Sequence, residues 1–230
     1  MDREGLVSAA SQPEERGVVR RALERLLGSA VVIGGAALKW GFLFGKFFAF
    51  FVSFALYSSL FGSWEFGLGL VLLILVHELG HFAEAKRQHL HVTLPTFVPL
   101  FGAFVTIRRA HLSPWRSTLV SLAGPFVGSL GAAVAWAAGS ARDSTLLLGL
   151  ANIGFLLNAV NLLPVGFLDG GSVTRAISEE RHPRIRYENG VPVEVVQGDQ
   201  RRALLMAAMY VVLAAAIVAG MLATKQGGTL

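Results

Sequence analysis

Residues 70–85 read LVLLILVHELGHFAEA, and this stretch decides how the rest of the chain is interpreted. It begins as an apolar run typical of a membrane-spanning helix and then carries two histidines and a glutamate, His77, His81 and Glu78. Ionisable side chains are costly to place inside a bilayer, so they are candidates for a functional site. The remaining sequence has to indicate which site they form.

The composition of the chain is typical of a membrane protein. Of its 230 residues, 53% are hydrophobic and only 15% are charged, whereas about a quarter of a soluble domain is charged. The apolar residues fall in long runs, which predicts an all-α polytopic membrane protein. The chain has no cysteine, which excludes disulfides and cysteine nucleophiles. Its net charge of +5 is spread over loops without a basic–aromatic pattern, so nucleic acid is not an expected partner.

About five transmembrane helices are expected, because a helix needs about 20 apolar residues to cross a bilayer. Lys39 and Lys46 interrupt the first segment, whose early part could instead lie at the membrane surface. The five segments are 33–61, 66–86, 117–139, 145–168 and 203–223. The predicted regions are a tail with an amphipathic stretch (1–28), a transmembrane core (29–171), a cytoplasmic loop (172–202) and a C-terminal helix with a short tail (203–230).

Lysine and arginine gather on one side of the predicted spans. The N-terminal tail and the segments after the second and fourth spans are rich in them, whereas the turns after the first and third spans carry few. Positively charged loops stay in the cytoplasm, so we expect the N-terminus there and the C-terminus on the opposite side. A bacterial inner membrane is the expected location, and an organelle membrane is the alternative.

The stretch HVTLPTFVPLFGAFVTIRR, residues 91–109, is apolar but poorly suited to a helix. Two prolines and a glycine interrupt it, with β-branched and aromatic residues between them, which favours strand. We expect a re-entrant or interfacial β-hairpin over 92–107, and an irregular interfacial loop is the alternative. An extended substrate could add to the edge of such a hairpin. The candidate substrate-binding residues are Gly102, Ala103, Phe104 and Val105.

The segment 172–202 contains a second turn signal. Asn189–Gly190 lies between short β-prone runs, which predicts a small hairpin. Glu179 and Glu180 lie in a polar, arginine-rich part of this segment, so we expect them on the solvated surface.

The spacing of HELGH predicts a metal site. His77 and His81 are four residues apart, on one face of a helix, where both imidazoles can reach one ion. Glu78 can project toward a water molecule at that ion. The alternative is two interfacial histidines and a snorkelling glutamate. It is disfavoured because the apolar run VLLILV leads directly into the motif.

A catalytic zinc site needs a third protein ligand and an open position. Asp169, in NAVNLLPVGFLDGG, is the acid that follows another apolar span directly. That span is expected to run in the same direction as the span that carries the histidines, and to end at Asp169. Both ligand sets would then lie at similar depth. Glu84, one turn beyond His81, is an alternative third ligand. We expect it instead at the edge of the membrane.

Three motifs together resemble the site-2 proteases, which are intramembrane zinc metalloproteases. They are HELGH on an apolar helix, AGP at residues 123–125 and NLLPVGFLDGG from Asn161. The resemblance implies that His77, His81 and Asp169 bind Zn²⁺, with Glu78 as the catalytic base. It also implies that Asn161 lies near the scissile peptide, and that the 92–107 hairpin is the re-entrant β element of that family.

The same resemblance implies hydrolysis of a peptide bond within or near the transmembrane segment of a membrane protein. The expected partners are therefore a transmembrane protein substrate and the lipid bilayer. The chain departs from many members of the family because it has room for neither a PDZ domain nor a CBS pair. A membrane metal-binding protein or transporter is an alternative function, since intramembrane His and Asp also mark ion pathways. A non-catalytic pseudoprotease is another.

Overall fold

The computed structural model describes residues 41, 45, 48–98, 102–106, 112–182, 184–188 and 191–226. Residues 49–230 form one unit, and the contacts below are within it. The predicted first span covers 33–61, and most of its part before Phe48 lies outside the described residues. The predicted N-terminal tail, 1–28, also lies outside them. The helices are Phe48–Phe61, α2 Trp64–Arg87, α3 Pro114–Arg142, α4 Thr145–Asn161, α5 Asp169–Arg181 and α6 Gln200–Gln226. The strands are β1 Thr96–Val98, β2 Gly102–Phe104, β3 Arg184–Glu188 and β4 Val191–Val196.

The protein is a mostly helical, multi-pass integral membrane protein, as the sequence predicts. Helices α2, α3 and α6 are long and apolar enough to cross a membrane, and two further apolar helices, Phe48–Phe61 and α4, are shorter. The 17 residues of α4 would span about 25 Å, somewhat less than the hydrocarbon core of about 30 Å. Three of the five predicted spans therefore have full-length helices among the described residues.

The predicted end of the fourth span is wrong. Helix α4 stops at Asn161, and Asp169 is the first residue of a separate helix, α5. Pro164 lacks an N–H, and its ring disfavours helical backbone at the residue before it. The chain therefore crosses a short connection, residues 162–168, before it becomes helical again. Helix α5 is not predictable from its sequence, because DGGSVTRAISEER is polar and has two glycines directly after its first residue.

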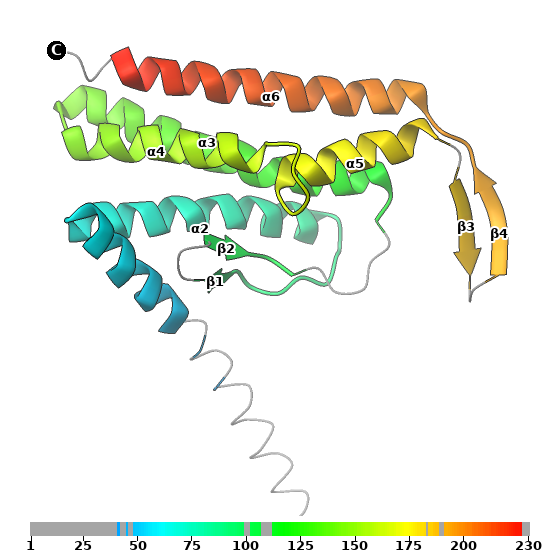
Figure 1. The fold of residues 1–230 in the computed structure, drawn as a ribbon, viewed down its shortest axis with the longest axis horizontal. Coiled ribbons are helices and arrows are strands. Elements are labelled where there is room, and N and C mark those ends of the chain that lie inside the picture. The colour runs from blue at the N-terminus through cyan, green and yellow to red at the C-terminus, as the bar shows by residue number, and fades with distance from the viewer. Residues whose placement is uncertain are drawn as a thin grey trace, which may run out of the picture. The chain divides into compact units, whose positions relative to one another are not determined.

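Helix α3 lies at the centre of the helical part and contacts α2, α4, α5 and α6. In Figure 1, α2 lies on one side of α3, α4 and α5, and α6 lies on the other. The spans alternate in direction, as the sequence predicts. His81 near the end of α2 bonds Val120 near the start of α3, and Asn152 early in α4 bonds Thr224 late in α6.

Helix α2 is well formed at both ends. Its N-cap, Ser63, accepts a hydrogen bond from the N–H of Phe66 at 3.1 Å, which satisfies a donor that the helix leaves free. Lys86 and Arg87 occupy the last turn, where positive charge is favourable. In the middle of α2, the side chains of Leu72 and Leu79 are exposed, as expected for side chains that face lipid.

The two larger apolar clusters hold most of the helices together. One cluster joins the four helices α3, α4, α5 and α6, and its buried members include Phe155, Val173 and Met206. The other joins α2 and α4 to the helix Phe48–Phe61 and to β1. In this second cluster the rings of Phe50 and Phe97 meet edge to face with centroids 5.2 Å apart. The second cluster therefore anchors strand β1 against the helices.

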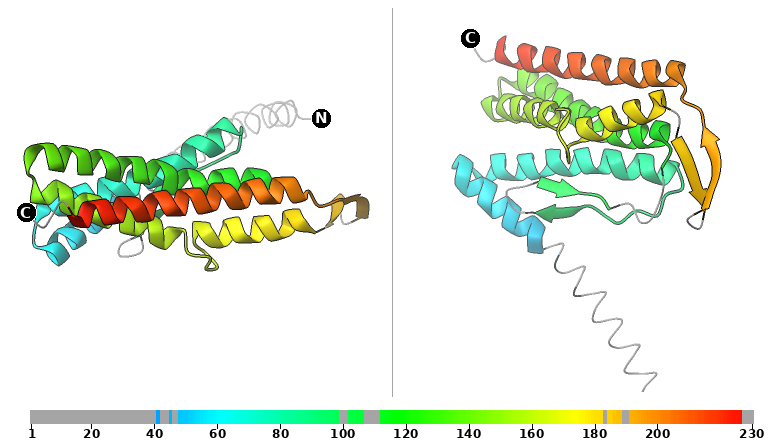
Figure 2. Two further views of the ribbon diagram at one scale, coloured as in Figure 1. Left: turned by 90° about the horizontal axis from the view of Figure 1, so that it is seen from above. Right: turned by 45° about the vertical axis from the view of Figure 1, so that its right-hand side comes forward.

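The hairpin predicted over 92–107 is confirmed. Strands β1 and β2 are antiparallel, with Thr96 opposite Phe104 and Phe97 opposite Ala103. The pair lies along α2 on the side away from α6, as Figure 1 and the right-hand view of Figure 2 show, and β2 contacts α2. This position brings one strand beside the helix that carries HELGH.

The smaller predicted hairpin is also confirmed, with β3 and β4 antiparallel on either side of residues 189–190. It lies at the end of the helices where α5 stops and α6 begins (Figure 2). The prediction that Glu180 lies on the solvated surface is wrong, because this residue is 3% exposed. Its position in α5, a helix that packs against α3 and α6, accounts for the burial.

Candidate metal centre

Three side chains from two helices converge at one point. The Nε2 atoms of His77 and His81, on α2, are 3.1 Å apart. The carboxylate of Asp169, the first residue of α5, lies 3.3 Å from each of them, with Oδ2 toward His77 and Oδ1 toward His81. The structure therefore brings together the three residues that the sequence analysis selected as metal ligands.

The two histidines and the glutamate of HELGH form a compact, buried group. The ligand atoms of His77, Glu78 and His81 all lie within 4.8 Å of one another. His77 is 7% exposed and Glu78 is 6% exposed. Charged side chains are rarely buried so deeply without a partner ion or a hydrogen-bond network.

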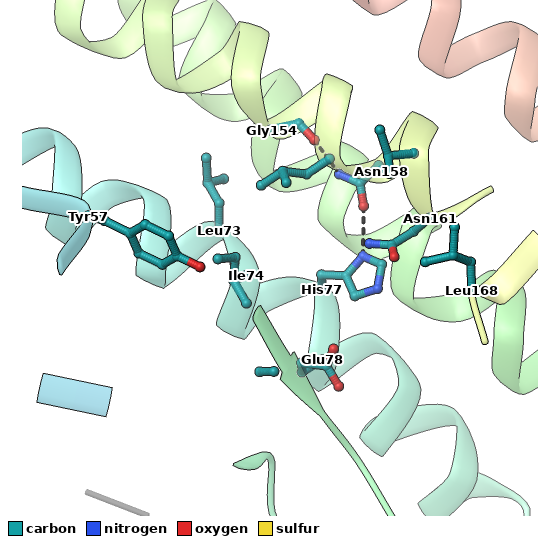
Figure 3. Close-up of a pocket in the computed structure, with 12 residues that line it drawn as sticks. Tyr57, Leu73, Ile74, His77, Glu78, Gly154, Asn158, Asn161 and Leu168 are labelled. Atoms are coloured by element: carbon teal, nitrogen blue, oxygen red, sulfur yellow. Dashed lines mark hydrogen bonds between the residues drawn. The ribbon is translucent and has the colours of Figure 1, made fainter. Parts of the chain in front are cut away.

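Hydrogen bonds determine which ring nitrogen of His77 carries its proton. The amide of Asn158 donates from Nδ2 to the carbonyl of Gly154 at 2.8 Å, so its Oδ1 faces His77 as an acceptor. That oxygen lies 2.8 Å from His77 Nδ1 (Figure 3). Nδ1 must therefore donate, which leaves a lone pair on Nε2 of the neutral ring.

His81 has the same tautomer for a different reason. Its Nδ1 lies 2.8 Å from the backbone carbonyl of Val120 on α3, and a carbonyl can only accept. Nε2 of His81 is then also an acceptor in the neutral ring. Such contacts from the second ring nitrogen are the usual way in which proteins orient metal-binding histidines.

This donor set fits a divalent cation. Two imidazole lone pairs and a carboxylate face one another at 3.1–3.3 Å, an arrangement that is repulsive without positive charge between them. Two nitrogens and one carboxylate also match the ligands of catalytic zinc sites, which leave a fourth position open. The chemistry of the residues is thus that of a metal site.

One carboxylate oxygen of Glu78 is available to accept a proton. Its Oε2 is buried and has no hydrogen-bond partner among the residues that the structure describes. A buried carboxylate oxygen without a donor is costly, and such a cost is retained where the group takes part in chemistry. Glu78 can therefore accept a proton from a molecule that enters the site.

Glycines in α2 and α3 allow the two helices to approach closely beside His81. A Cβ on Gly124 would lie 2.2 Å from Nε2 of His81, and one on Gly80 would lie 2.4 Å from the carbonyl of Ala123. No side chain fits at either place. The glycine of the AGP motif therefore provides the space that the imidazole of His81 occupies.

The connection between α4 and α5 positions Asp169. A Cβ on Gly170 would lie 2.0 Å from the carbonyl oxygen of Leu162, so the connection packs directly on the first turn of α5. The hydroxyl of Tyr210, on α6, donates to the same carbonyl, and Arg175 donates to the carbonyl of Gly166 at 2.5 Å. These contacts hold the first turn of α5 in place, and with it the carboxylate.

Two hollows meet at the reactive side chains. One has a volume of about 230 Å³, and the other, more open, has a volume of about 500 Å³. Both are lined by His77, Glu78 and Asn161. A molecule that extends from one hollow into the other must therefore pass Glu78.

The remaining predicted site residues line these hollows to different extents. Asn161, the last residue of α4, and Ala103 of β2 line both, whereas Phe104 and Val105 line only the larger one. Gly102 is the first residue of β2 and pairs with Val98. The structure therefore brings the candidate substrate-binding residues Ala103, Phe104 and Val105 to the site.

Glu84, the alternative third ligand, is engaged elsewhere. The carboxylate of Glu84 accepts two hydrogen bonds from Arg87 at 2.6 and 2.7 Å and one from Gln88. These are contacts at the end of α2, one turn beyond His81. Asp169 is therefore the acid that reaches the histidine pair.

Sequence reasoning missed two features of the site. Asn158 is three residues before Asn161 on the same helix, and this spacing is a signal of a shared face, but the contact with His77 is not readable from it. Phe167, which is 89% exposed and lines the larger hollow, gives no signal in an apolar stretch. Both roles depend on how distant helices pack.

The comparisons with known proteins agree with this geometry. Residues 65–142 and 141–197 match the family described as Peptidase family M50. No curated protein matches the sequence. The matched segments contain the HELGH pair and Asp169 and extend over more than half of the chain. The protein therefore belongs to peptidase family M50, a family of metallopeptidases.

Proposed function

We propose that this protein is an intramembrane zinc metalloprotease that hydrolyses a peptide bond within or near the transmembrane segment of a membrane protein. The observation that carries the proposal is the convergence of Asp169 with the histidine pair beside Glu78, whose Oε2 has no hydrogen-bond partner among the described residues. Membership of the M50 family supports the same reaction. The long apolar helices around the site support a substrate that reaches it from the membrane.

His77, His81 and Asp169 would hold the zinc ion through two imidazole nitrogens and a carboxylate. A bound zinc ion supplies Lewis acidity, which makes water a stronger acid and polarises a carbonyl group. The contacts from Asn158 and the carbonyl of Val120 keep both imidazoles in the tautomer that presents Nε2. These two contacts therefore orient both imidazoles for an ion.

Glu78 acts as general base and then as general acid. Its free oxygen takes a proton from the attacking water while the water oxygen bonds to the substrate carbonyl carbon. When the C–N bond breaks, Glu78 returns this proton to the leaving nitrogen. Asn161, which lines both hollows with Glu78, donates its side-chain amide to the developing oxyanion.

Strand β2 provides the docking edge for the substrate. A peptide bond in a helix is shielded by its own hydrogen bonds, so the substrate must become extended before it is cut. Ala103 lines both hollows, so a strand added beside β2 would pass Glu78. Gly102, Ala103, Phe104 and Val105 are the proposed docking residues.

The membrane arrangement that we propose has five crossings with the N-terminus in the cytoplasm, in a bacterial inner membrane. Helix α2 and helix α4 run in the same direction (Figure 1). Arg87 at the end of α2 is on the basic side of the protein. This side is the cytoplasmic one by the distribution of positive charge.

The test is cleavage of a single-span membrane protein after co-reconstitution in lipid vesicles with zinc. We expect wild type to produce a defined fragment, and Glu78→Gln to bind zinc but lose at least about 100-fold in rate. Glu65→Gln is a matched control, because Glu65 lies in the first turn of the same helix. Normal cleavage by Glu78→Gln would contradict the proposal, and zinc flux without proteolysis would favour a transporter.

A further inference from the structure

The smaller hollow is a cavity with one polar end, at the reactive side chains and Asn158, and an otherwise mainly apolar wall. Its walls come from the helix Phe48–Phe61, α2 and α4, and its rim is formed by Glu78, His77 and Asn161 (Figure 3). The residues that form the apolar wall are Tyr57, Leu73, Ile74 and Leu157. The cavity therefore begins at the catalytic group and extends away from it between helices.

The chemistry of the wall determines what could occupy this cavity. Apart from Glu78 and His77, none of its described lining residues is ionisable at neutral pH. A charged group placed against the apolar wall would lose its hydration without gaining a partner there, which is strongly unfavourable. An apolar group would gain about 25 cal/mol for each Å² removed from water. The wall therefore selects an apolar occupant.

The volume of the cavity indicates how large an apolar group it can accommodate. Its volume is about 230 Å³, and an apolar cavity of about 150 Å³ already accommodates benzene. A phenylalanine or leucine side chain can therefore enter, whereas alanine would leave most of the volume unfilled. Empty apolar volume costs contact energy, so a large side chain is favoured over a small one.

The proposed substrate path brings one side chain to this cavity. Successive side chains of an extended strand point to opposite faces. Ala103 lines both hollows, so a strand that passes it has the small cavity on one side and the larger hollow on the other. A residue adjacent to the bond at Glu78 can then direct its side chain into the small cavity.

We propose that the cavity lined by Tyr57, Leu73, Ile74 and Leu157 is a specificity pocket that receives the side chain of a substrate residue adjacent to the scissile bond. This inference rests on the proposed proteolytic function. It identifies the preferred substrates as those with a bulky apolar residue, such as phenylalanine or leucine, next to the cleaved bond. Most residues of a transmembrane segment are apolar, so the pocket discriminates among them by size.

The experiment varies the substrate and the pocket together. A single-span substrate whose cleavage site has been located by mass spectrometry is made with Phe, Leu, Ala or Asp at each position flanking the bond. Wild type is expected to prefer Phe over Ala at one of these positions by about tenfold in kcat/KM. Leu157→Trp fills the pocket and should reduce this ratio by about tenfold.

Leu156→Trp is the matched control. Leu156 is the neighbouring residue of α4 but is 39% exposed and does not line the cavity. The same increase in size is then made on a surface outside the pocket. The Phe-to-Ala preference of this variant should stay within about twofold of wild type.

The possible results distinguish a failure of the proposed pocket from a failure of the proposed proteolytic function. Cleavage by Leu157→Trp with an unchanged Phe-to-Ala ratio would overturn the inference while leaving the protease intact. If Leu157→Trp is inactive, the variant Ile74→Ala, which enlarges the pocket, takes its place. This variant should raise the cleavage rate of a substrate with Trp at the preferred position relative to the substrate with Phe there. An unchanged Trp-to-Phe ratio would overturn the inference. Absence of cleavage by wild type on every substrate would overturn the proposed function and this inference with it.

Discussion

The Nδ1 of His77 lies 2.8 Å from the Oδ1 of Asn158, across the interface between α2 and α4. Asn158 is 3% exposed and is itself oriented by its bond to the carbonyl of Gly154. The contact therefore connects the metal centre to the packing of α4. It makes the orientation of one proposed ligand depend on a residue that is 81 positions away in the chain.

Asn158→Leu should lower the affinity for zinc by about 10- to 100-fold, because the imidazole of His77 loses the acceptor that sets its tautomer and orientation. Zinc affinity is measured by competition with a chromogenic chelator. Asn152→Leu is the control, since Asn152 lies earlier in the same helix and bonds Thr224 instead. Equal affinities for the two variants would show that the Asn158 contact has no part in binding.

Gly124→Ala should also weaken zinc binding, by at least about tenfold. The new methyl group would lie 2.2 Å from Nε2 of His81, so the ring has to leave the position in which Nε2 faces Asp169. Gly131→Ala on the same helix is the control, because its nearest neighbour is Val76 Cγ1 at 3.2 Å and needs only a small adjustment. Wild-type affinity in Gly124→Ala would mean that His81 does not bind in the orientation described here.

Removal of the metal should lower the thermal stability of the protein. An ion that binds only the folded state adds about 2.7 kcal/mol to the free energy of unfolding when its free concentration is 100 times Kd. We therefore expect Tm to fall on chelation and to recover with added zinc. The effect should be absent in His77→Ala. A Tm that does not respond to chelator or zinc would indicate that no ion is bound.

Val105→Pro, at the residue directly after β2, should reduce kcat/KM by about tenfold or more while zinc affinity stays unchanged. Proline removes the backbone N–H that bonds the Glu78 carboxylate, and it disfavours strand pairing at the larger hollow. Val191→Pro in the second hairpin is the control, since this exposed residue belongs to β4. Cleavage rates and zinc affinity are measured on the same preparations. Unimpaired cleavage by Val105→Pro would exclude substrate docking along β2.

Much of the site could be predicted because its signals are local. The four-residue spacing of His77 and His81 on an apolar helix indicates the metal pair directly. The prolines and β-branched residues of 92–107 likewise indicate the hairpin. Asp169 could be selected because an acid directly after an apolar stretch has few other roles.

The remaining features depend on tertiary packing. The sequence did not indicate that α4 stops at Asn161 and that Asp169 opens a new helix, because apolar character continues through residues 162–168. The burial of Glu180 could not be predicted either, since its neighbours in sequence are polar and only the packing of α5 covers it. No sequence signal links the carbonyl of Val120 to His81.

The central claim is that His77, His81 and Asp169 hold one metal ion together. The most direct test measures zinc stoichiometry and affinity of wild type, Asp169→Asn and Asp143→Asn by competition titration and metal analysis. Asp143→Asn is the matched control, because Asp143 is exposed and has a left-handed backbone that asparagine also adopts. We predict one zinc ion per chain in wild type and in Asp143→Asn, and a loss of affinity of at least about tenfold in Asp169→Asn. Wild-type affinity in Asp169→Asn would contradict the account.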